Sequence, residues 1–221
     1  MALVARRRDR LEQLAGRVEQ QGGRSLVIEA DVADPEQARK AVERTVNELG
    51  RLDTLINNAG VMLLGPIQDA PLEEWERMLD VNLSGLLHCA HAALPELLRA
   101  AEDGPRQVAD MVNISSVAGR VARQGSGVYN LTKYGVGAFS ESLRQEVTQR
   151  HVRVALVEPG AVATELASHN RPEIRETISQ RFGSIVRLEA SDIADGICYI
   201  ITRPRHVAIN ELLIRPTEQQ G

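Results

Sequence analysis

The chain of 221 residues is long enough for one α/β domain with a sizeable core, and we expect a single domain over residues 1–221. Its net charge of −4 argues against a nucleic-acid-binding surface, and its aromatic content of 3% argues against a platform on which bases stack. No apolar run reaches the roughly 18 residues of a membrane span, and residues 1–5 are too short for the apolar part of a signal peptide, so we expect neither.

The first predicted element is a short buried strand at residues 2–5, followed by a helix of about three turns that ends at a pair of glycines. Arg6 and Arg7 lie at the carboxyl end of this strand. Cations are unfavourable at the N-terminus of a helix, so this position favours an anionic ligand. The alternative is a solvated helix start that binds nothing.

A second buried strand is predicted at residues 25–30, and Asp31 and Val32 follow it. The next helix, which runs to about residue 49, begins with Asp34 as its N-cap and with a proline at its first position. Asp31 is either a ligand contact at the strand end or a plain turn residue, and the local pattern is compatible with both.

A third strand, at residues 52–57, leads into Asn58, Ala59 and Gly60. Small side chains at such a turn allow the backbone to approach a ligand closely. The alternative is that Asn58 mainly ties neighbouring strands together, and both roles can hold at once.

A long helix is predicted at residues 72–99, with an interruption near Pro95. It carries Asn82, a poor residue for a helix interior, which indicates a compensating role. His88 and His91 are three residues apart, but no carboxylate or further ligand accompanies them at a spacing that suits a metal. We therefore predict no metal site and interpret the two histidines as packing or interface residues.

The strand at residues 110–113 and the helix at residues 129–150 bring three polar side chains toward one crevice. Ser116 lies at the carboxyl end of the strand, where ligands bind in open α/β sheets. Tyr129 and Lys133 are four residues apart and therefore lie one above the other on the helix.

These three side chains suit proton transfer. A free tyrosine has a pKa near ~10 and is a poor base at neutral pH, and the nearby Lys133 ammonium favours the phenolate form of Tyr129. Ser116 can hold a substrate carbonyl or hydroxyl oxygen against Tyr129. The alternative is a surface tyrosine–lysine pair on an amphipathic helix, and the place of Ser116 at a strand end favours the catalytic interpretation.

The rest of the chain contains four predicted segments: a buried strand at 152–157, a lid segment over the substrate at 167–187, a helix at 191–202 and a last strand at 207–214. Pro159, Gly160, Val162 and Thr164 follow the first of these strands. The lid segment is mixed in charge and weak in periodicity.

The alternation of strands and helices predicts an α/β fold, with a doubly wound parallel sheet and helices on both faces. Cys89 and Cys198 lie in the apolar patterns of two of the helices, which indicates buried free thiols in a reducing compartment. We therefore expect a cytoplasmic protein.

Four short motifs are similar, in order and spacing, to those of the short-chain dehydrogenase/reductase family: Asn57-Asn-Ala-Gly60, Asn113-Ile-Ser-Ser116, Tyr129-x-x-x-Lys133 and Pro159-Gly160. The resemblance covers nearly the whole chain and implies a Rossmann-like fold. Residues 62–66 and 210–217 resemble the NADP-dependent branch of this family that includes clavulanic acid dehydrogenase.

The resemblance implies an oxidoreductase that interconverts a carbonyl and an alcohol on a small-molecule substrate by hydride transfer. It implies that Tyr129 is the acid/base and that Lys133 tunes it and holds the cofactor ribose. By the same resemblance, Ser116 orients the substrate oxygen, and Asn82 bends its helix and orders a water of the proton relay.

The resemblance also implies contacts with a nicotinamide cofactor. In the family, the residues after the second strand meet the adenosine ribose, where arginine suits a 2′-phosphate; Arg6 and Arg7 therefore favour NADP(H) over NAD(H). The other expected cofactor contacts are Asp31, Val32, Asn58, Ala59, Gly60, Tyr129, Lys133, Pro159, Gly160, Val162 and Thr164.

The strand and glycine-rich turn with which the family's fold opens do not occur in this sequence. We therefore expect that the chain begins at the family's second strand. On this expectation, the central strand between those at residues 2–5 and 52–57 is absent.

The helices at residues 72–99 and 129–150 carry apolar residues on more than one face. These residues include Leu86, Leu87, Val136 and Phe139. The resemblance implies that the two helices pair across a two-fold axis, so we expect a homodimer or homotetramer and no nucleic-acid or membrane partner. Two rival interpretations keep the fold: an epimerase that uses the same tyrosine, and a non-catalytic nucleotide-sensing or scaffold protein.

Overall fold

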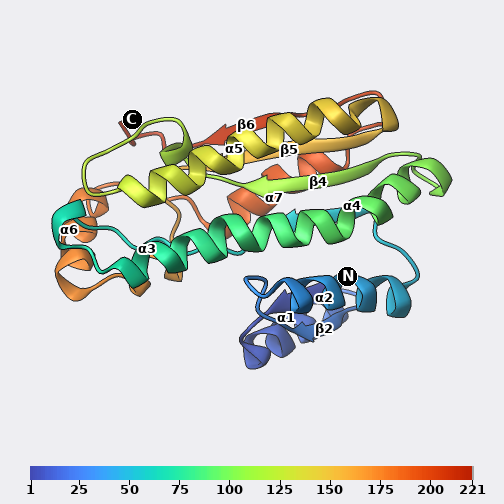
Figure 1. Ribbon diagram of the computed structural model, residues 1–221, viewed down its shortest axis with the longest axis horizontal. Coiled ribbons are helices and arrows are strands. Elements are labelled where there is room, and N and C mark those ends of the chain that lie inside the picture. The colour runs from blue at the N-terminus through green and yellow to red at the C-terminus, as the bar shows by residue number, and fades with distance from the viewer. Residues whose placement is uncertain (221) are drawn as a thin grey trace.

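Strands and helices alternate along the chain in the computed structural model of the protein, which describes residues 1–220 (Figure 1). The strands are β1 (Ala2–Ala5), β2 (Leu26–Glu29), β3 (Thr54–Asn57), β4 (Ala109–Ile114), β5 (Val152–Pro159) and β6 (Glu211–Ile214). The helices are α1 (Arg8–Gln20), α2 (Pro35–Leu49), α3 (Leu72–Leu79), α4 (Gly85–Asp103), α5 (Gly127–Val147), α6 (Pro172–Phe182) and α7 (Ala190–Ile201). All strand pairs are parallel, which confirms the predicted Rossmann-like α/β fold.

The strands form two groups. β3, β4, β5 and β6 pair in that order, and β1 pairs with β2. Figure 1 shows that β1, β2, α1 and α2 lie together below the larger sheet, and Val42 of α2 packs against the core beneath α4. β1 and β3 each keep one edge that pairs with no described strand, and the apolar Val4 and Ile56 on these strands are 37% and 40% exposed.

Helices cover both faces of the larger sheet. On one face, Leu97 of α4 and Leu143 of α5 pack with Met111 of β4 in a fully apolar cluster. On the other face, Ile200 of α7 packs against Val112 of β4. Burial on both sides explains why β4 and β5 are almost continuous apolar runs rather than alternating ones.

The start and end of α2 follow from its sequence, and the predicted N-cap is confirmed. The carboxylate of Asp34 accepts hydrogen bonds from the backbone N–H groups of Glu36 and Gln37, at 2.9 and 3.0 Å, and Pro35 occupies the first turn. Gly50 ends the helix in the left-handed region, with φ of 88°, which costs a glycine little.

The helix predicted over residues 72–99 is two helices, α3 and α4, joined by the π-helical segment Asp80–Ser84. The predicted interruption near Pro95 is wrong, because α4 continues through this residue. Ala93 and Leu97 on either side of Pro95 are fully buried, so tertiary packing maintains the helix where the proline removes a backbone donor.

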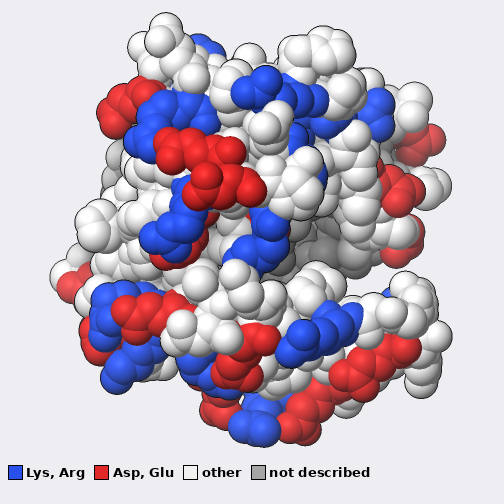
Figure 2. Space-filling model, turned by 90° about the vertical axis from the view of Figure 1, so that its right-hand side faces the viewer, with Lys and Arg blue, Asp and Glu red and all other residues white. Residues whose placement is uncertain are grey.

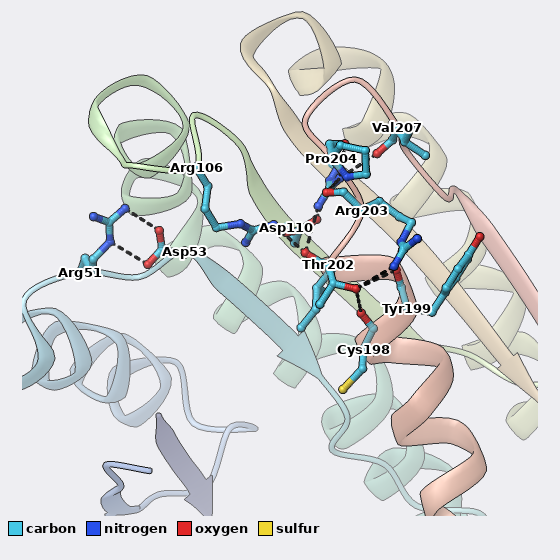
Figure 3. Close-up of polar contacts among 12 residues, drawn as sticks. Arg51, Asp53, Arg106, Asp110, Cys198, Tyr199, Thr202, Arg203, Pro204 and Val207 are labelled. Carbon is cyan, nitrogen blue, oxygen red and sulfur yellow. Dashed lines mark hydrogen bonds and ion pairs between the residues drawn. The ribbon is translucent and has the colours of Figure 1, made fainter. Parts of the chain in front are cut away.

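A buried ionic network joins the amino ends of β4 and β5 (Figure 3). The Asp110 carboxylate accepts hydrogen bonds from Arg153 Nε at 2.7 Å and from Arg106 Nη2 at 3.0 Å. Arg153 Nη1 also donates to the carbonyl oxygens of Arg203 and Val207, at 3.0 and 2.7 Å. Asp110 and Arg153 are both buried, so the network fixes the loop between α7 and β6 to the sheet, at the end opposite to Ser116.

Basic and acidic side chains are interspersed over the face of the molecule shown in Figure 2, without an extended field of either sign.

Cys89 is half-buried and Cys198 is exposed, so the prediction that both thiols are buried is wrong for Cys198. Cys198 lies on the outer side of α7, beside the exposed Tyr199. Among the helices of residues 1–220, none has both the length and the apolar character needed to cross a membrane.

Candidate active site

Ser116 lies directly beyond β4, at the start of a single 3₁₀ turn, Val117–Gly119. Its hydroxyl oxygen accepts a hydrogen bond from the Ala118 N–H at 3.1 Å, and the hydroxyl donates to the Pro159 carbonyl at the end of β5, at 3.4 Å. The Ser116 side chain is therefore held between the carboxyl ends of two neighbouring strands, β4 and β5. This is where the sequence predicted the crevice.

Tyr129 and Lys133 lie on successive turns at the start of α5, and both side chains are buried. The Lys133 ammonium nitrogen is 5.8 Å from the centre of the Tyr129 ring and donates a hydrogen bond to the Ile114 carbonyl at 2.9 Å. An ammonium has three donors, so two remain that no other part of residues 1–220 uses.

Ser116 and Tyr129 line the same cavity, whose volume is about 150 Å³. Its walls come from the segment after β3, the loop before α5, the turn after β5 and the lid segment that carries α6. Lys133 is not part of the wall and lies one turn further along α5 than Tyr129. The structure thus brings two of the three predicted polar groups to the cavity surface and leaves the third behind them.

Burial determines the ionisation of both groups on α5. It raises the pKa of the Tyr129 phenol to about 12, and hydrogen bonding with the Ser116 hydroxyl opposes this rise. Burial lowers the pKa of the Lys133 ammonium to about 8. The expected lowering of the Tyr129 pKa by Lys133 is not found, because burial of the phenol outweighs an ammonium 5.8 Å away. At neutral pH the phenol is therefore protonated.

Asn82 lies in the π-helical segment Asp80–Ser84 and is buried. Its Oδ1 accepts a hydrogen bond from the Val61 N–H at 2.8 Å, and its Nδ2 donates to the Val61 carbonyl at 2.9 Å and to Thr132 Oγ1 at 3.1 Å. The side chain therefore fastens the helix to the segment after β3 and to α5. Interruptions of this π-helical kind are frequent at functional sites.

The glycine in the turn after β3, Gly60, leaves two polar groups of the site accessible. A Cβ atom on Gly60 would lie 3.4 Å from Asn82 Oδ1 and 3.9 Å from Lys133 Nζ, so any larger side chain would stand over both. The preceding residues, Asn58 and Ala59, are exposed. The three residues form an open rim beside the two buried polar groups.

The tie between neighbouring strands that was considered for Asn58 belongs to Asn57 instead. Asn57 Nδ2 donates to Asn113 Oδ1 at 2.8 Å, and Asn113 Nδ2 donates to Ser140 Oγ on α5 at 2.9 Å. Strand pairing places Asn57 directly beside Asn113. Two asparagines at matching strand ends were the sequence signal that could have predicted this contact.

The predicted cofactor residues at the ends of β1 and β2 are close to one another. Arg6 Nη1 lies 3.7 Å from Asp31 Oδ2, and Asp31 Oδ1 also accepts a hydrogen bond from the Ala33 N–H at 3.0 Å. Arg7 Nη1 donates to Glu165 Oε2 at 2.9 Å. Asp31 is thus both a turn residue and an ionic partner, and Arg7 reaches the segment that precedes the lid.

Val32 packs on α4. Its carbonyl oxygen lies 3.2 Å from His88 Nδ1, and a Cβ on Gly85 would lie 2.9 Å from the Val32 side chain. Of the two roles predicted for His88 and His91, packing or interface, His88 has a packing contact, whereas His91 is exposed. Within the described part of the chain, no group of three His, Cys, Asp or Glu side chains is placed to hold a metal ion.

The turn after β5 is covered by the last residues of the chain. Gly160 and Val162 line the cavity, while the Thr164 hydroxyl caps the following 3₁₀ turn. Gln219 Oε1 accepts a hydrogen bond from the Ala161 N–H at 2.8 Å and contacts Gly160, so a larger residue at Gly160 would displace it. This contribution of Gln219 was not predicted.

Asn130, next to Tyr129, was also missed. It is buried, and its Nδ2 donates to the carbonyls of Ala118 and Val121 at 2.6 and 3.1 Å, while its Oδ1 accepts from the Arg123 N–H at 3.2 Å. One amide therefore holds the whole loop between β4 and α5 against the helix that carries Tyr129.

An ion pair supports the Ser116 turn from the other side. The Arg120 guanidinium binds the buried Glu158 carboxylate through two parallel hydrogen bonds, 2.7 and 2.6 Å long, and also pairs with Glu211 of β6. Because Glu158 directly precedes Pro159, this pair fixes the turn after Ser116 relative to the end of β5.

The completed arrangement can hold an oxygen atom and move a proton at it. Two hydroxyls, those of Ser116 and Tyr129, face one cavity, and the Lys133 ammonium with two spare donors lies behind. Such a set suits acid/base chemistry at a carbonyl or alcohol.

The chain is similar to known oxidoreductases. A model of the short chain dehydrogenase family matches residues 1–175. An uncharacterized oxidoreductase of Staphylococcus saprophyticus is 37% identical over 223 residues, which cover 99% of this chain and 86% of the relative.

Solved structures show the same fold. The closed form of a serine dehydrogenase complexed with NADP+ matches with a TM-score of 0.86 and 30% identity, over 100% of this chain and 86% of that protein. A metagenomic short-chain oxidoreductase in complex with NADP matches with a TM-score of 0.79 and 26% identity, over 99% of this chain and 86% of that protein.

Proposed function

Because the chain belongs to the short-chain dehydrogenase/reductase family, we propose that it is an NADP(H)-dependent oxidoreductase that interconverts a carbonyl and an alcohol on a small molecule. One observation carries the proposal: the hydroxyls of Ser116 and Tyr129 line the same small cavity, with Lys133 one turn behind. The two motifs at residues 62–66 and 210–217 support a place in the branch that includes clavulanic acid dehydrogenase.

The residues around the cavity fit a nicotinamide cofactor. When bound, this group supplies or takes up the hydride at C4 of its ring. Lys133 has two donors left for ribose hydroxyls, and Gly60 keeps the approach to them open. We assign the remaining contacts to Asp31, Val32, Asn58, Ala59, Tyr129, Pro159, Gly160, Val162 and Thr164.

The choice of NADP(H) over NAD(H) rests on Arg6 and Arg7. Both lie just beyond β1, and guanidinium groups bind phosphate through several hydrogen bonds. The serine dehydrogenase and the metagenomic oxidoreductase described above were both solved with NADP bound, which supports the same choice here.

Tyr129 is the proton donor in the direction of reduction. Its pKa of about 12 keeps the phenol protonated at neutral pH, so it can give its proton to the carbonyl oxygen as the carbonyl carbon gains the hydride. Ser116 holds the same oxygen and so fixes its distance from the phenol. In the direction of oxidation the phenolate is needed, and a charged Lys133 then stabilises it.

Asn82 supports this chemistry through position. Its side-chain amide bonds with Val61 and Thr132, which place the segment after β3 and the first turns of α5 relative to each other. Its Oδ1 and the Lys133 ammonium both lie beside Gly60, where an ordered water can join them.

The exposed faces of α4 and α5 support assembly into a homodimer or homotetramer. Of the apolar residues noted on these helices, Leu86 and Val136 are buried within the protomer and cannot contribute to an interface. Leu87, Leu131 and Tyr134 are exposed on these helices, and we assign the interface to them.

We also propose that the protein acts in the cytoplasm, where its two free thiols remain reduced.

A cofactor-oxidation assay tests the proposed function. The purified protein is mixed with NADPH and a panel of small aldehydes and ketones, and the loss of NADPH absorbance is followed. Turnover that Tyr129→Phe abolishes supports the proposal. Binding of NADPH without turnover of any carbonyl, or of any alcohol with NADP+, would instead support a nucleotide-sensing protein.

A further inference from the structure

Basic side chains border the cavity that Ser116 and Tyr129 line. Two arginines, Arg123 and Arg187, contribute to its wall, and none of the described residues that line it is acidic. The Arg187 guanidinium beside a small and otherwise largely apolar space favours an anionic occupant.

The backbone of the residue that follows Arg187 is held in place by two hydrogen bonds. Leu188, its neighbour, donates its N–H to the Ala161 carbonyl at 3.0 Å and accepts the Ala163 N–H at 2.8 Å. These bonds attach the end of the lid segment to the turn after β5, which itself borders the cavity. The backbone that carries the Arg187 side chain is thus fixed relative to the turn after β5.

None of the described side chains supplies a counter-ion to the Arg187 guanidinium. Most other arginines in the described chain are paired with a carboxylate, as Arg120 is with Glu158, whereas Arg187 forms no ion pair or side-chain hydrogen bond with another described residue. It is nevertheless half-buried. A partly desolvated guanidinium is most stable when an anion completes its hydrogen bonds.

The remainder of the wall limits the rest of the ligand. Met62, Leu64, Leu166 and Ile178 contribute apolar surface, and the volume of about 150 Å³ suits a short molecule. A carboxylate matches the planar fork of a guanidinium with two parallel hydrogen bonds. We infer that the substrate is a short oxo acid, or the corresponding hydroxy acid, whose carboxylate binds Arg187 while its carbonyl or hydroxyl oxygen lies at Ser116 and Tyr129. This inference rests on the proposed function, because it names the substrate class of the same site.

Matched pairs of acids and esters test the inference. Pyruvate, acetoacetate and 4-oxopentanoate are each compared with their methyl ester, with NADPH as reductant, so that only the negative charge differs within a pair. We expect at least one acid to have a higher kcat/KM than its ester. Arg187→Gln should lower kcat/KM for that acid by about 10- to 100-fold and leave the ester nearly unchanged. Arg187→Lys, which keeps the charge but not the fork, should retain part of the preference.

Two controls separate the alternatives. Arg175→Gln removes one charge from the exposed side of the same lid segment and should leave the acid-to-ester ratio unchanged. The Kd for NADPH, measured by fluorescence titration without substrate, should be the same for Arg187→Gln and the parent protein.

Three results would overturn the inference. Equal kcat/KM values for every acid and its ester, unchanged in Arg187→Gln, would show that the charge is not recognised. A weaker Kd for NADPH that accounts for the whole loss would assign Arg187 to a cofactor phosphate. A parent protein that binds NADPH but reduces neither acids nor esters would overturn the proposed function itself, and the inference with it.

Discussion

Lys133 lies one helical turn beyond Tyr129, and its ammonium nitrogen is 5.8 Å from the centre of the phenol ring. Burial moves the pKa values of the two groups apart, to about 8 for Lys133 and about 12 for Tyr129, so each favours its neutral form. Because the two groups are neighbours in a buried site, charge on one stabilises opposite charge on the other. Lys133 therefore holds its proton more strongly once Tyr129 has lost its own.

Tyr129→Phe should lower kcat for carbonyl reduction by at least ~10²-fold, because the variant keeps the ring and loses the proton donor. Unfolding by urea should be little affected, since the ring continues to fill its place in the core. Tyr134→Phe is the matched control, because Tyr134 lies on the same helix but is 45% exposed. Parental turnover in Tyr129→Phe would exclude this residue as the acid.

Lys133→Met should remove a pH dependence of stability in the alkaline range. Folding lowers the pKa of Lys133 from 10.5 to about 8. Between these values the unfolded chain holds the proton and the folded chain has released it, so the free energy of unfolding rises with pH, by up to about 3 kcal/mol. Below pH 8 both states hold the proton, and the folded state bears the full cost of the buried charge.

Urea unfolding of both proteins from about pH 8 to about pH 10 measures this difference. The parent protein should gain stability relative to Lys133→Met as pH rises across the range. A constant difference between the two curves would show that Lys133 keeps its ordinary pKa.

Replacing Arg6 and Arg7 by glutamine should weaken NADPH binding by about 10-fold or more and leave NADH binding nearly unchanged, because only NADPH carries the 2′-phosphate. Glu165→Gln should have the opposite effect, since it releases Arg7 and Arg10 from their ion pairs. Fluorescence titration of the two cofactors measures both effects. Equal losses for NADPH and NADH would contradict the assignment of the 2′-phosphate.

Asp110→Asn should lower the free energy of unfolding by about 3–5 kcal/mol, because it leaves the buried Arg153 without its counter-charge. The pair of Arg51 and Asp53, also visible in Figure 3, provides the control. Both of its side chains are partly exposed, so Arg51→Gln should cost less than ~1 kcal/mol. Similar losses in the two variants would mean that burial adds nothing to the Asp110 network.

Leu131→Glu should convert the proposed homo-oligomer into monomers. Leu131 is 58% exposed on α5, and a carboxylate there would be desolvated in an interface between two copies. Leu14→Glu, at an exposed position on α1, should leave assembly unchanged. Light scattering at micromolar concentration measures the mass, and a monomeric parent protein would refute the proposed assembly.

Local spacing and the geometry of parallel sheets predicted much of the candidate site. The interval of four residues between Tyr129 and Lys133 set their common helix face, and the strand before Ser116 placed it at the ligand-binding edge. The structure brings Ser116 and Tyr129 to one cavity as expected. Where prediction differed, as at Pro95, packing of neighbouring residues outweighed the local preference.

The supporting contacts could not be predicted in the same way. Arg120 with Glu158 and Arg153 with Asp110 join residues about 40 positions apart, at places set by strand order and register. Several chemically equivalent partners exist for each arginine in the sequence, and only the fold selects among them. Arg187 had no periodic pattern around it, so its place in the cavity wall followed only from the pairing of Leu188 with the turn after β5.

The π-helical segment Asp80–Ser84 sets the rotational phase between α3 and α4. Each residue turns an α-helix by about 100°, and a π turn accommodates one residue more than a regular turn. Met78 of α3 packs with Tyr129 beside the cavity, whereas Leu97 of α4 packs on the sheet. Deleting one residue from this segment would restore a regular helix but rotate one of these two apolar stripes into solvent. The nearly continuous helix α3–α4 therefore packs on two apolar clusters at once. A uniform α-helix of the same length could not direct its apolar residues toward both.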